Sequence, residues 1–320
     1  MGECGTLSRP RAREFALAQA RRGRPVSVRN RAMAFDSISR RGLLGAGAAL
    51  LAPGVFAAPP AAFVTDYETR TGGRAGFYAR NAATGRRLAW RAVERFAMCS
   101  TFKASLAGLV LARVDQGRER LDRAVAFGPA DLLDYAPVAK AHAAAGTMTI
   151  ETMCAAVVEL SDNTCANLLL REIGGPQAMT EFWRAIGDGV SRLDHNEPEL
   201  NRTRPGELPD TTTPAAMAHT MLQLTNGTVL APASRERLAG WLVSSKTGLR
   251  KLRAGLPADW RAGDKTGSNG ADAAGDLAVA WPAATGPIVI CAYTQGGKPA
   301  AGQQDELFAA IGRLVATTIA

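Results

Sequence analysis

The sequence predicts an α+β domain of the α/β sandwich type, with a five-stranded antiparallel sheet, flanking helices and an inserted all-helical subdomain. Two observations predict this class. Short alternating apolar and polar stretches, typical of strands, occur near residue 80 and again between residues 259 and 294. The stretch from residue 100 to about 242 instead has helical periodicity, interrupted by glycine and proline clusters. Because strands from both ends can share one sheet, we expect the active cleft to lie between the sheet and the helical part.

The first predicted elements are a helix and a hairpin. "FVTDYETRTGG", residues 63–73, has helical spacing and a glycine stop. Residues 75–93 form two short alternating segments around turn residues 81–85, which indicates a hairpin. Strand patterns return near the C-terminus in "DWRAGDKTG", "GDLAVAWP" and "PIVICAYT", and a helix is expected over about residues 305–318.

Residues 58–320, the part of the chain that follows the export signal described below, are therefore divided into two subdomains. The sheet subdomain takes residues 58–92 and 247–320, and the helical subdomain takes residues 93–246. A chain of 320 residues with 47% hydrophobic content can bury a core of this size.

The net charge of +9 is concentrated in residues 1–57, which contain ten arginines and three acidic residues. Paired arginines, Arg40 and Arg41, precede a short apolar run and small residues near Ala57, a pattern typical of a twin-arginine export signal. The run contains Pro53 and is shorter than the roughly 20 residues of a membrane span. We expect an exported, periplasmic protein without stable membrane association. Residues 1–57, here called the leader, lack the interleaved aromatic residues of a nucleic-acid-binding arm. Translation could start at Met1 or at Met33.

Cysteines and histidines indicate neither disulfides nor a metal. No Cys-x-x-Cys pair exists, and four cysteines with apolar neighbours remain after the leader, so we expect free buried thiols at positions 99, 154, 165 and 291. The three histidines are isolated and lack metal-ligand spacing. We expect no metal and no cofactor.

The first chemistry-bearing motif is a serine and a lysine three residues apart, Ser100 and Lys103, at the start of an apolar helix. Positions i and i+3 share a helix face, so the lysine can reach the hydroxyl. A serine nucleophile needs an adjacent base, and burial at the positive end of a helix lowers a lysine pKa. By itself, the pair is more typical of a plain helix cap than of a catalytic site.

Two further motifs follow in the chain. Ser161, Asp162 and Asn163 precede a helix, where such residues also serve as caps. Lys265, Thr266, Gly267 and Ser268 lie at the end of a predicted strand, which suits either a solvated turn or an anion-binding edge. The order and spacing of the three motifs, about 60 and then about 100 residues apart, resemble the penicillin-recognising serine enzymes.

A long irregular segment, residues 191–214, indicates which class of penicillin-recognising enzyme the sequence resembles. It has neither helical nor strand periodicity, and a loop of this length is usually functional. Within it, "RLDHNEPELN" resembles the Ω loop of class A β-lactamases, whose glutamate and asparagine hold the water that hydrolyses the acyl-enzyme. The match falls on Glu197 and Asn201. The resemblance to class A serine β-lactamases extends from about Phe63 to the end of the chain.

The resemblance implies a role for each matching residue. Ser100 attacks the β-lactam carbonyl, and its proton passes to Lys103 or, through a water, to Glu197. Ser161 protonates the departing nitrogen with electrostatic support from Lys265. Backbone N–H groups of Ser100 and Ser268 form the oxyanion hole. Substrate-binding roles fall on Asn163, Asn201, Thr266, Gly267, Ser268 and Tyr135, although Tyr135 is equally typical of core packing. Small-molecule β-lactams are the expected partners, no nucleic acid is expected, and the protein is expected to be a monomer.

Three positions depart from the family pattern. His195 occupies the position of an arginine that pairs with Asp210 in the family. Because histidine is shorter and mostly neutral at pH 7, we expect a weaker pair between residues 195 and 210, here called the His195 clasp, and a mobile loop. The alternative is a loop held by Arg192 and Asp194. Ala274 occupies the position of an arginine that binds the substrate carboxylate, and Lys251 or Arg250 is its expected replacement. Cys99 lacks a disulfide partner because position 269 is asparagine, so we expect turnover of penicillins and cephalosporins but poor turnover of carbapenems.

Two other functions are compatible with Ser100 and Lys103: a DD-peptidase and a non-catalytic β-lactam sensor. A DD-peptidase lacks the glutamate at position 197, and a non-catalytic β-lactam sensor holds its acyl group and usually has a transmembrane segment. A Ser-His-Asp hydrolase is excluded because the sequence has no Gly-x-Ser-x-Gly elbow. Glu197 therefore favours the hydrolase.

Overall fold

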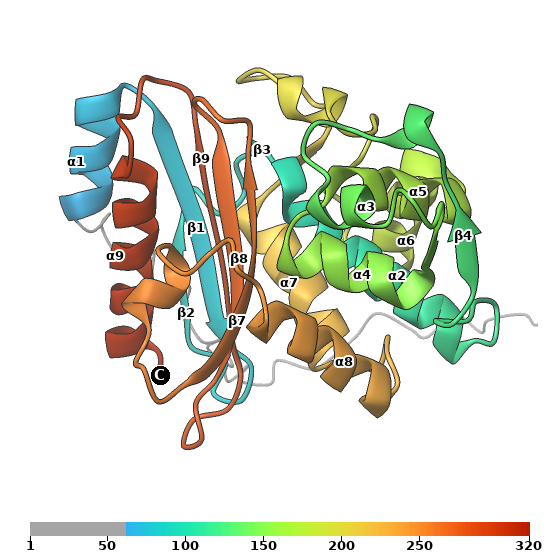
Figure 1. Ribbon diagram of the computed structural model, residues 1–320. Helices are drawn as coiled ribbons and strands as arrows, with labels where there is room; N and C mark the ends of the chain where they lie inside the picture. The colour runs from blue at the N-terminus through green and yellow to red at the C-terminus, as the bar shows by residue number, and fades with distance from the viewer. Residues whose placement is uncertain (1–61) are drawn as a thin grey trace, which may run out of the picture. The chain divides into compact units, whose positions relative to one another are not determined.

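A five-stranded antiparallel sheet forms the centre of the computed structural model, which describes residues 62–320 (Figure 1). The strands lie in the order β2-β1-β9-β8-β7. Their bounds are Arg74–Asn81 for β1, Arg87–Trp90 for β2, Arg261–Ser268 for β7, Ala274–Trp281 for β8 and Ile288–Gln295 for β9. Strands from the start and the end of the described chain share this sheet because β1 pairs with β9 over eight residues. The predicted fold class is confirmed.

Two helices cover one face of the sheet, α1 (Ala62–Thr71) and α9 (Gln303–Thr318) (Figure 1). Side chains from both helices and from that face of the sheet form one apolar core, which includes Val64, Tyr67, Ile290, Phe308 and Ile311. Burying this apolar stripe is what holds the two terminal helices on the sheet.

The helical region covers the other face of the sheet. Helix α7 (Pro214–Thr225) contacts β1 and β9, and α8 (Pro232–Val243) contacts β7. Helix α2 (Phe102–Asp115) is the centre of this region, with every residue from Phe102 to Ala112 buried. Because neighbours surround it, this stretch is apolar on all sides apart from Lys103 and Ser105. Those neighbours include α4 (Ile150–Glu159), α5 (Asn163–Ile173) and α6 (Gly175–Ala185).

The predicted helical subdomain, residues 93–246, also contains short extended segments. β3 (Phe96–Ala97) pairs with β6 (Thr211–Thr212), and β4 (Ala124–Ala126) pairs with β5 (Thr147–Thr149). Segments of two or three residues are too short to show alternation in a sequence. The remaining elements are α3 (Pro137–Ala141) and four 3-10 turns, η1 (Cys99–Thr101), η2 (Pro129–Asp131), η3 (Glu199–Arg202) and η4 (Leu252–Gly255).

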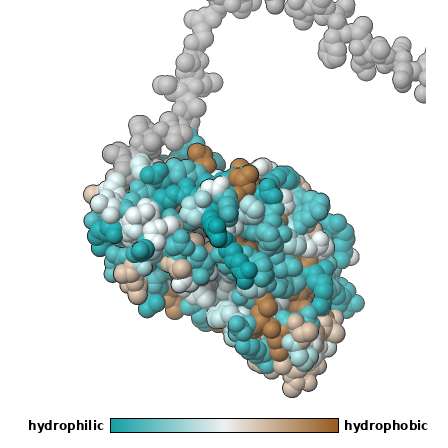
Figure 2. Space-filling model, turned by 90° about the horizontal axis from the view of Figure 1, so that it is seen from above, coloured by the Kyte–Doolittle hydropathy of each residue, from teal (hydrophilic) through white to brown (hydrophobic). Residues whose placement is uncertain are grey.

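Several sequence expectations concern the whole domain. The four cysteines at positions 99, 154, 165 and 291 are free and buried, as predicted. Within residues 62–320, no helix is long and apolar enough to cross a bilayer. The face shown in Figure 2 is predominantly hydrophilic, with hydrophobic residues in small separate groups. The predicted export signal lies outside the described residues.

Candidate active site

Ser100 lies in the 3-10 turn η1, immediately before α2. Its hydroxyl does not cap the helix, because Thr101 occupies the N-cap position without a side-chain cap hydrogen bond. Instead, Ser100 Oγ accepts a hydrogen bond from Lys103 Nζ at 3.0 Å and donates one to Glu197 Oε1 at 3.0 Å. The structure therefore decides against the cap interpretation of this serine.

Backbone geometry around Ser100 is unusual on both sides of the site. Cys99 has a φ of 43°, in the left-handed region that costs a non-glycine residue free energy. On the facing strand, a Cβ atom placed on Gly267 would lie 2.8 Å from Met98 O and 2.8 Å from Ser100 N. Strand β7 can therefore approach the serine this closely only because residue 267 is glycine.

Lys103 is fully buried and contacts most of the predicted catalytic groups. Its Nζ lies 2.8 Å from Glu197 Oε1 and donates hydrogen bonds to Asn163 Oδ1 at 2.6 Å and to Ser161 O at 2.9 Å. Burial lowers the pKa of Lys103, and the neighbouring carboxylate of Glu197 opposes that shift. A lysine in this environment can lose its proton more readily than one in water.

Ser161 lies between two lysines. Lys265 Nζ donates a hydrogen bond to Ser161 Oγ at 3.0 Å, and Lys103 Nζ lies 3.5 Å from the same oxygen. Burial, together with the positive charge of Lys103, lowers the pKa of Lys265 to about 7. The backbone of Ser161 has a φ of 59°, so this residue, like Cys99, is held in a strained conformation.

Within the tripeptide Ser161-Asp162-Asn163, Asp162 is the residue that caps helix α5. Its Oδ1 accepts a hydrogen bond from Cys165 N at 2.8 Å at the start of α5, and its Oδ2 accepts bonds from the N–H groups of Val138 and Ala139. The cap interpretation is thus correct for the middle residue only. By fixing Asp162, the fold places Ser161 and Asn163 on either side of Lys103.

Glu197 is held in place by two asparagines. Asn167 Oδ1 accepts a hydrogen bond from Glu197 N, and Asn167 Nδ2 donates one to Glu197 O, both at 2.9 Å. Asn201 Nδ2 donates to Glu197 Oε2 at 2.6 Å. Asn167 was not predicted as a site residue, although its position four residues after Asn163 on the same face of α5 was the available signal.

The substrate-binding candidates lie around this cluster. Thr266 is buried within β7, an edge strand of the sheet, and donates a hydrogen bond to Thr247 Oγ1 at 2.7 Å. Ser268 is exposed at the end of the same strand. Tyr135 is 51% exposed, which excludes core packing, and its carbonyl accepts a hydrogen bond from Asn163 N at 3.0 Å.

The structure does not bring Lys251 to this cluster. Lys251 Nζ forms an ion pair with Asp305 of α9 and lies 5.3 Å from the centre of the Phe308 ring, in the layer that covers the other face of the sheet. Arg250 Nε lies 3.4 Å from the same aspartate. Because Asp305 holds both cations, the expectation that either one replaces the missing arginine at Ala274 is not supported.

The His195 clasp closes despite the shorter side chain. His195 Nδ1 lies 2.6 Å from Asp210 Oδ2, while Asp210 Oδ1 accepts bonds from the backbone N–H groups of Asp194 and His195. The hydrogen bond with Asp210 raises the pKa of His195. Arg192 also pairs with Asp194, so both interactions considered from the sequence occur together.

Comparison with known proteins agrees with this geometry. The model of the β-lactamase enzyme family matches residues 59–319. Beta-lactamase L2 of Stenotrophomonas maltophilia is 49% identical over 76% of this chain and 80% of its own length. Beta-lactamase CTX-M-25 of Escherichia coli is 42% identical over 78% of this chain and 85% of its own length.

Solved structures extend the likeness to the fold. An ancestral (GNCA) class A β-lactamase is 54% identical, with a TM-score of 0.77 over 80% of this chain and 98% of its own. A β-lactamase from Xanthomonas campestris is 43% identical, with a TM-score of 0.78 over 81% and 97%. The chain belongs to the β-lactamase enzyme family. Within that family, it is a class A serine β-lactamase, an enzyme that hydrolyses β-lactams.

Proposed function

We propose that this enzyme opens the β-lactam ring of penicillins and cephalosporins through an acyl-enzyme on Ser100, and that it confers antibiotic resistance. One observation carries the proposal. The Ser100 hydroxyl lies 3.0 Å from both Lys103 Nζ and Glu197 Oε1, so the nucleophile has two candidate bases within direct reach.

In the acylation step, Ser100 Oγ attacks the β-lactam carbonyl carbon, and the hydroxyl proton passes to Lys103 or to Glu197. The developing oxyanion is assigned to the backbone N–H groups of Ser100 and Ser268, each worth about 3 kcal/mol in comparable acyl transfers. The close approach of β7 to η1 at Gly267 supports this assignment.

Ring opening requires a proton at the departing nitrogen. Ser161 is the proposed donor because its hydroxyl lies within hydrogen-bond distance of Lys265. With a pKa of about 7, Lys265 can replace the proton that Ser161 gives up.

Deacylation is assigned to Glu197. Its carboxylate, oriented by Asn201, accepts a proton from the water that attacks the acyl-enzyme. The attack breaks the ester bond to Ser100 Oγ, which takes back a proton from Glu197 or Lys103, and hydrolysis is complete. This step distinguishes a hydrolase from the DD-peptidase and sensor alternatives, which keep the acyl group.

Substrate binding is assigned around this centre. Thr266 and Ser268 would bind the substrate carboxylate, with Gly267 providing the backbone edge between them. Asn163 would bind the acylamino side chain, Asn201 would contact the substrate beside Glu197, and Tyr135 would line the rim. The partly exposed ring of Tyr135 supports its assignment.

The cellular setting remains part of the proposal. The paired arginines and the apolar run of the leader support export to the periplasm, where β-lactams meet their targets. We propose that the mature enzyme acts there as a monomer without stable membrane association.

Steady-state hydrolysis of a penicillin, an oxyimino-cephalosporin and a carbapenem tests the proposal, with Ser100→Ala and Glu197→Ala beside the unchanged enzyme. We expect turnover of the first two substrates, little turnover of the carbapenem, and no acylation of Ser100→Ala. Mass spectrometry of Glu197→Ala should detect an accumulated acyl-enzyme. A persistent acyl group on the unchanged enzyme would support the DD-peptidase or sensor alternative instead.

A further inference from the structure

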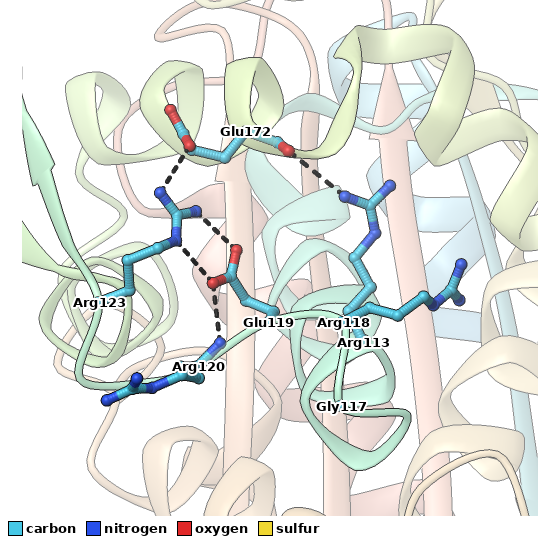
Figure 3. A pocket seen from close by; sticks show the side chains of 7 residues that line it. All are labelled: Arg113, Gly117, Arg118, Glu119, Arg120, Arg123 and Glu172. Atoms are coloured by element: carbon cyan, nitrogen blue, oxygen red, sulfur yellow. Dashed lines mark hydrogen bonds and ion pairs between the residues drawn. The ribbon is translucent and has the colours of Figure 1, made fainter.

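An arginine-rich pocket of about 530 Å³ lies at the C-terminal ends of α2 and α5. It is lined by Arg113, Gly117, Arg118, Glu119, Arg120, Arg123 and Glu172. Figure 3 shows Arg120 and Arg123 on one side of the pocket, Arg113 and Arg118 on the other, and Glu119 between them. A volume of this size is within the range of small-molecule sites.

Both carboxylates of the pocket pair with Arg123, and Glu172 Oε1 also lies 3.5 Å from Arg171 Nε. Glu119 accepts hydrogen bonds from Arg123 Nε at 2.8 Å and Nη2 at 2.6 Å, and Glu172 Oε2 accepts one from Arg123 Nη1 at 2.9 Å. Outside the lining, Asp122 pairs with Arg120 through two hydrogen bonds. The charges of Arg120 and Arg123 are therefore compensated.

Arg113 and Arg118 have no such partner, since neither forms an ion pair with a carboxylate among residues 62–320. The half-buried Arg113 donates its hydrogen bonds to the carbonyls of Glu172 at 3.3 Å and Ile173 at 2.6 Å. The exposed Arg118 donates to the side chain of Gln116. Burial and the positive charge of Arg118 lower the pKa of Arg113, and the carboxylate of Glu119 opposes that shift.

The last backbone carbonyls of both helices already accept hydrogen bonds, so the guanidinium groups of the pocket have to outweigh only the partial negative charge of the helix C-termini. Arg113 covers the final carbonyls of α5, and the turn after α2 caps that helix through N–H groups of Gln116, Gly117 and Arg118. Gly117 has a φ of 68°, which suits the left-handed end of a helix. A ligand entering the pocket therefore meets guanidinium groups rather than free carbonyl oxygens.

We propose that this pocket binds a ligand that carries phosphoryl groups, held by Arg113 and Arg118. The planar guanidinium group binds phosphate oxygens in pairs and supplies charge-assisted hydrogen bonds. The volume suits a diphosphate, or a phosphate on a larger scaffold such as a lipid headgroup. Helix α2 has 14 residues and is therefore about 21 Å long, so this site is distinct from the catalytic groups at its other end. The proposal goes beyond β-lactam hydrolysis and does not depend on it.

Thermal unfolding of the full chain with increasing inorganic pyrophosphate tests the proposal, at ionic strength held constant with sodium chloride. A ligand that binds only the folded state raises Tm as its concentration exceeds Kd. We expect a saturable rise for the unchanged protein and an apparent Kd at least tenfold weaker for Arg118→Gln. The matched control is Arg80→Gln, which removes an exposed arginine of β1 and should behave like the unchanged protein.

A second arm identifies the source of the phosphate. Sedimentation with phosphatidylglycerol vesicles, compared with phosphatidylcholine vesicles, measures headgroup binding. Arg118-dependent sedimentation with phosphatidylglycerol assigns a lipid phosphate, and an Arg118-dependent pyrophosphate shift without sedimentation assigns a free one. Unchanged hydrolysis by Arg118→Gln without ligand shows that this variant is folded. Equal responses of the unchanged protein and Arg118→Gln, or no response in either arm, would overturn the proposal.

Discussion

Charged residues lie at both ends of helices α2 and α5, but they are buried at the N-terminal ends and partly exposed at the C-terminal ends. At their N-terminal ends, Lys103 and Glu197 are fully buried and in contact with each other and with Ser100. At their C-terminal ends, Arg123 pairs with Glu119 and Glu172 while its side chain remains 40% exposed. Water solvates the exposed charges, whereas the buried charges depend on one another. The catalytic end should therefore be far more sensitive to substitution.

The largest effect is expected for Lys103→Met. Loss of a positioned base typically lowers the rate about 10²- to 10⁴-fold, and the substitution also leaves Glu197 buried without its partner. We expect kcat/KM for a penicillin to fall within that range and urea unfolding to show a loss of stability. The double variant Lys103→Met/Glu197→Gln should be more stable than the single variant. A single variant as stable as the unchanged enzyme would contradict the role of the buried pair.

Gly267→Ala tests the close approach of β7 to Ser100. The added Cβ would lie 2.8 Å from Ser100 N, so the N–H assigned to the oxyanion hole must move, and we expect kcat/KM to fall about 10²-fold. Gly240→Ala in α8 is the matched control, because its Cβ meets no atom within 4 Å and activity should be unchanged. Equal activities of Gly267→Ala and Gly240→Ala would show that the close approach of β7 to Ser100 does not require glycine at position 267.

Asn167→Ala tests how Glu197 is positioned. The variant loses two hydrogen bonds to the backbone of Glu197, and displacement of a catalytic group by about 1 Å can cost about 10²-fold in rate. We expect deacylation to slow more than acylation, so that stopped-flow kinetics show a burst followed by a slow steady state. Gln177→Ala, on the exposed surface of α6, should retain normal kinetics. An equal slowing of both steps would indicate a general structural defect instead.

A smaller, pH-dependent effect is expected at the His195 clasp. Its folded pKa is raised, so the clasp contributes stability that is fully present below about pH 6.5 and is lost as the pH rises through the folded pKa. The difference in Tm between the unchanged enzyme and His195→Asn should therefore shrink from pH 5 to pH 9. It should be modest throughout, since the histidine side chain is 52% exposed. A difference in Tm that grows from pH 5 to pH 9 would contradict a stabilising role for protonated His195.

The smallest effect is expected for Arg123→Gln at the other end of the helices. Ion pairs near the surface typically contribute about 0 to 1 kcal/mol; the Arg123 side chain is 40% exposed although its partners Glu119 and Glu172 are mostly buried, and Arg123 contacts no catalytic group. Urea unfolding should show a change within that range, and kcat/KM should stay the same. A loss of activity here would show that the two helix ends are coupled.

The sequence predicted much of the fold because its elements have clear local signals. The five strands and both terminal helices follow patterns of alternation or helical spacing. The short strands β3 to β6 were missed because they lack a readable period and depend on pairing with distant residues. Asn167 was missed for a related reason, since its hydrogen bonds join α5 to a loop 30 residues away.

By itself, the sequence determined the residue types and their order: a serine and a lysine three apart, a Ser-Asp-Asn cap, a glutamate in an irregular segment and a lysine at a strand end. Only the tertiary structure decided that Ser100 contacts Glu197 rather than capping α2, that Lys103 meets Asn163, and that Lys251 is held by Asp305. The physical reason is distance along the chain. Local patterns reflect backbone preferences, whereas burial and contact between residues up to about 100 positions apart set the charges and the geometry of the site.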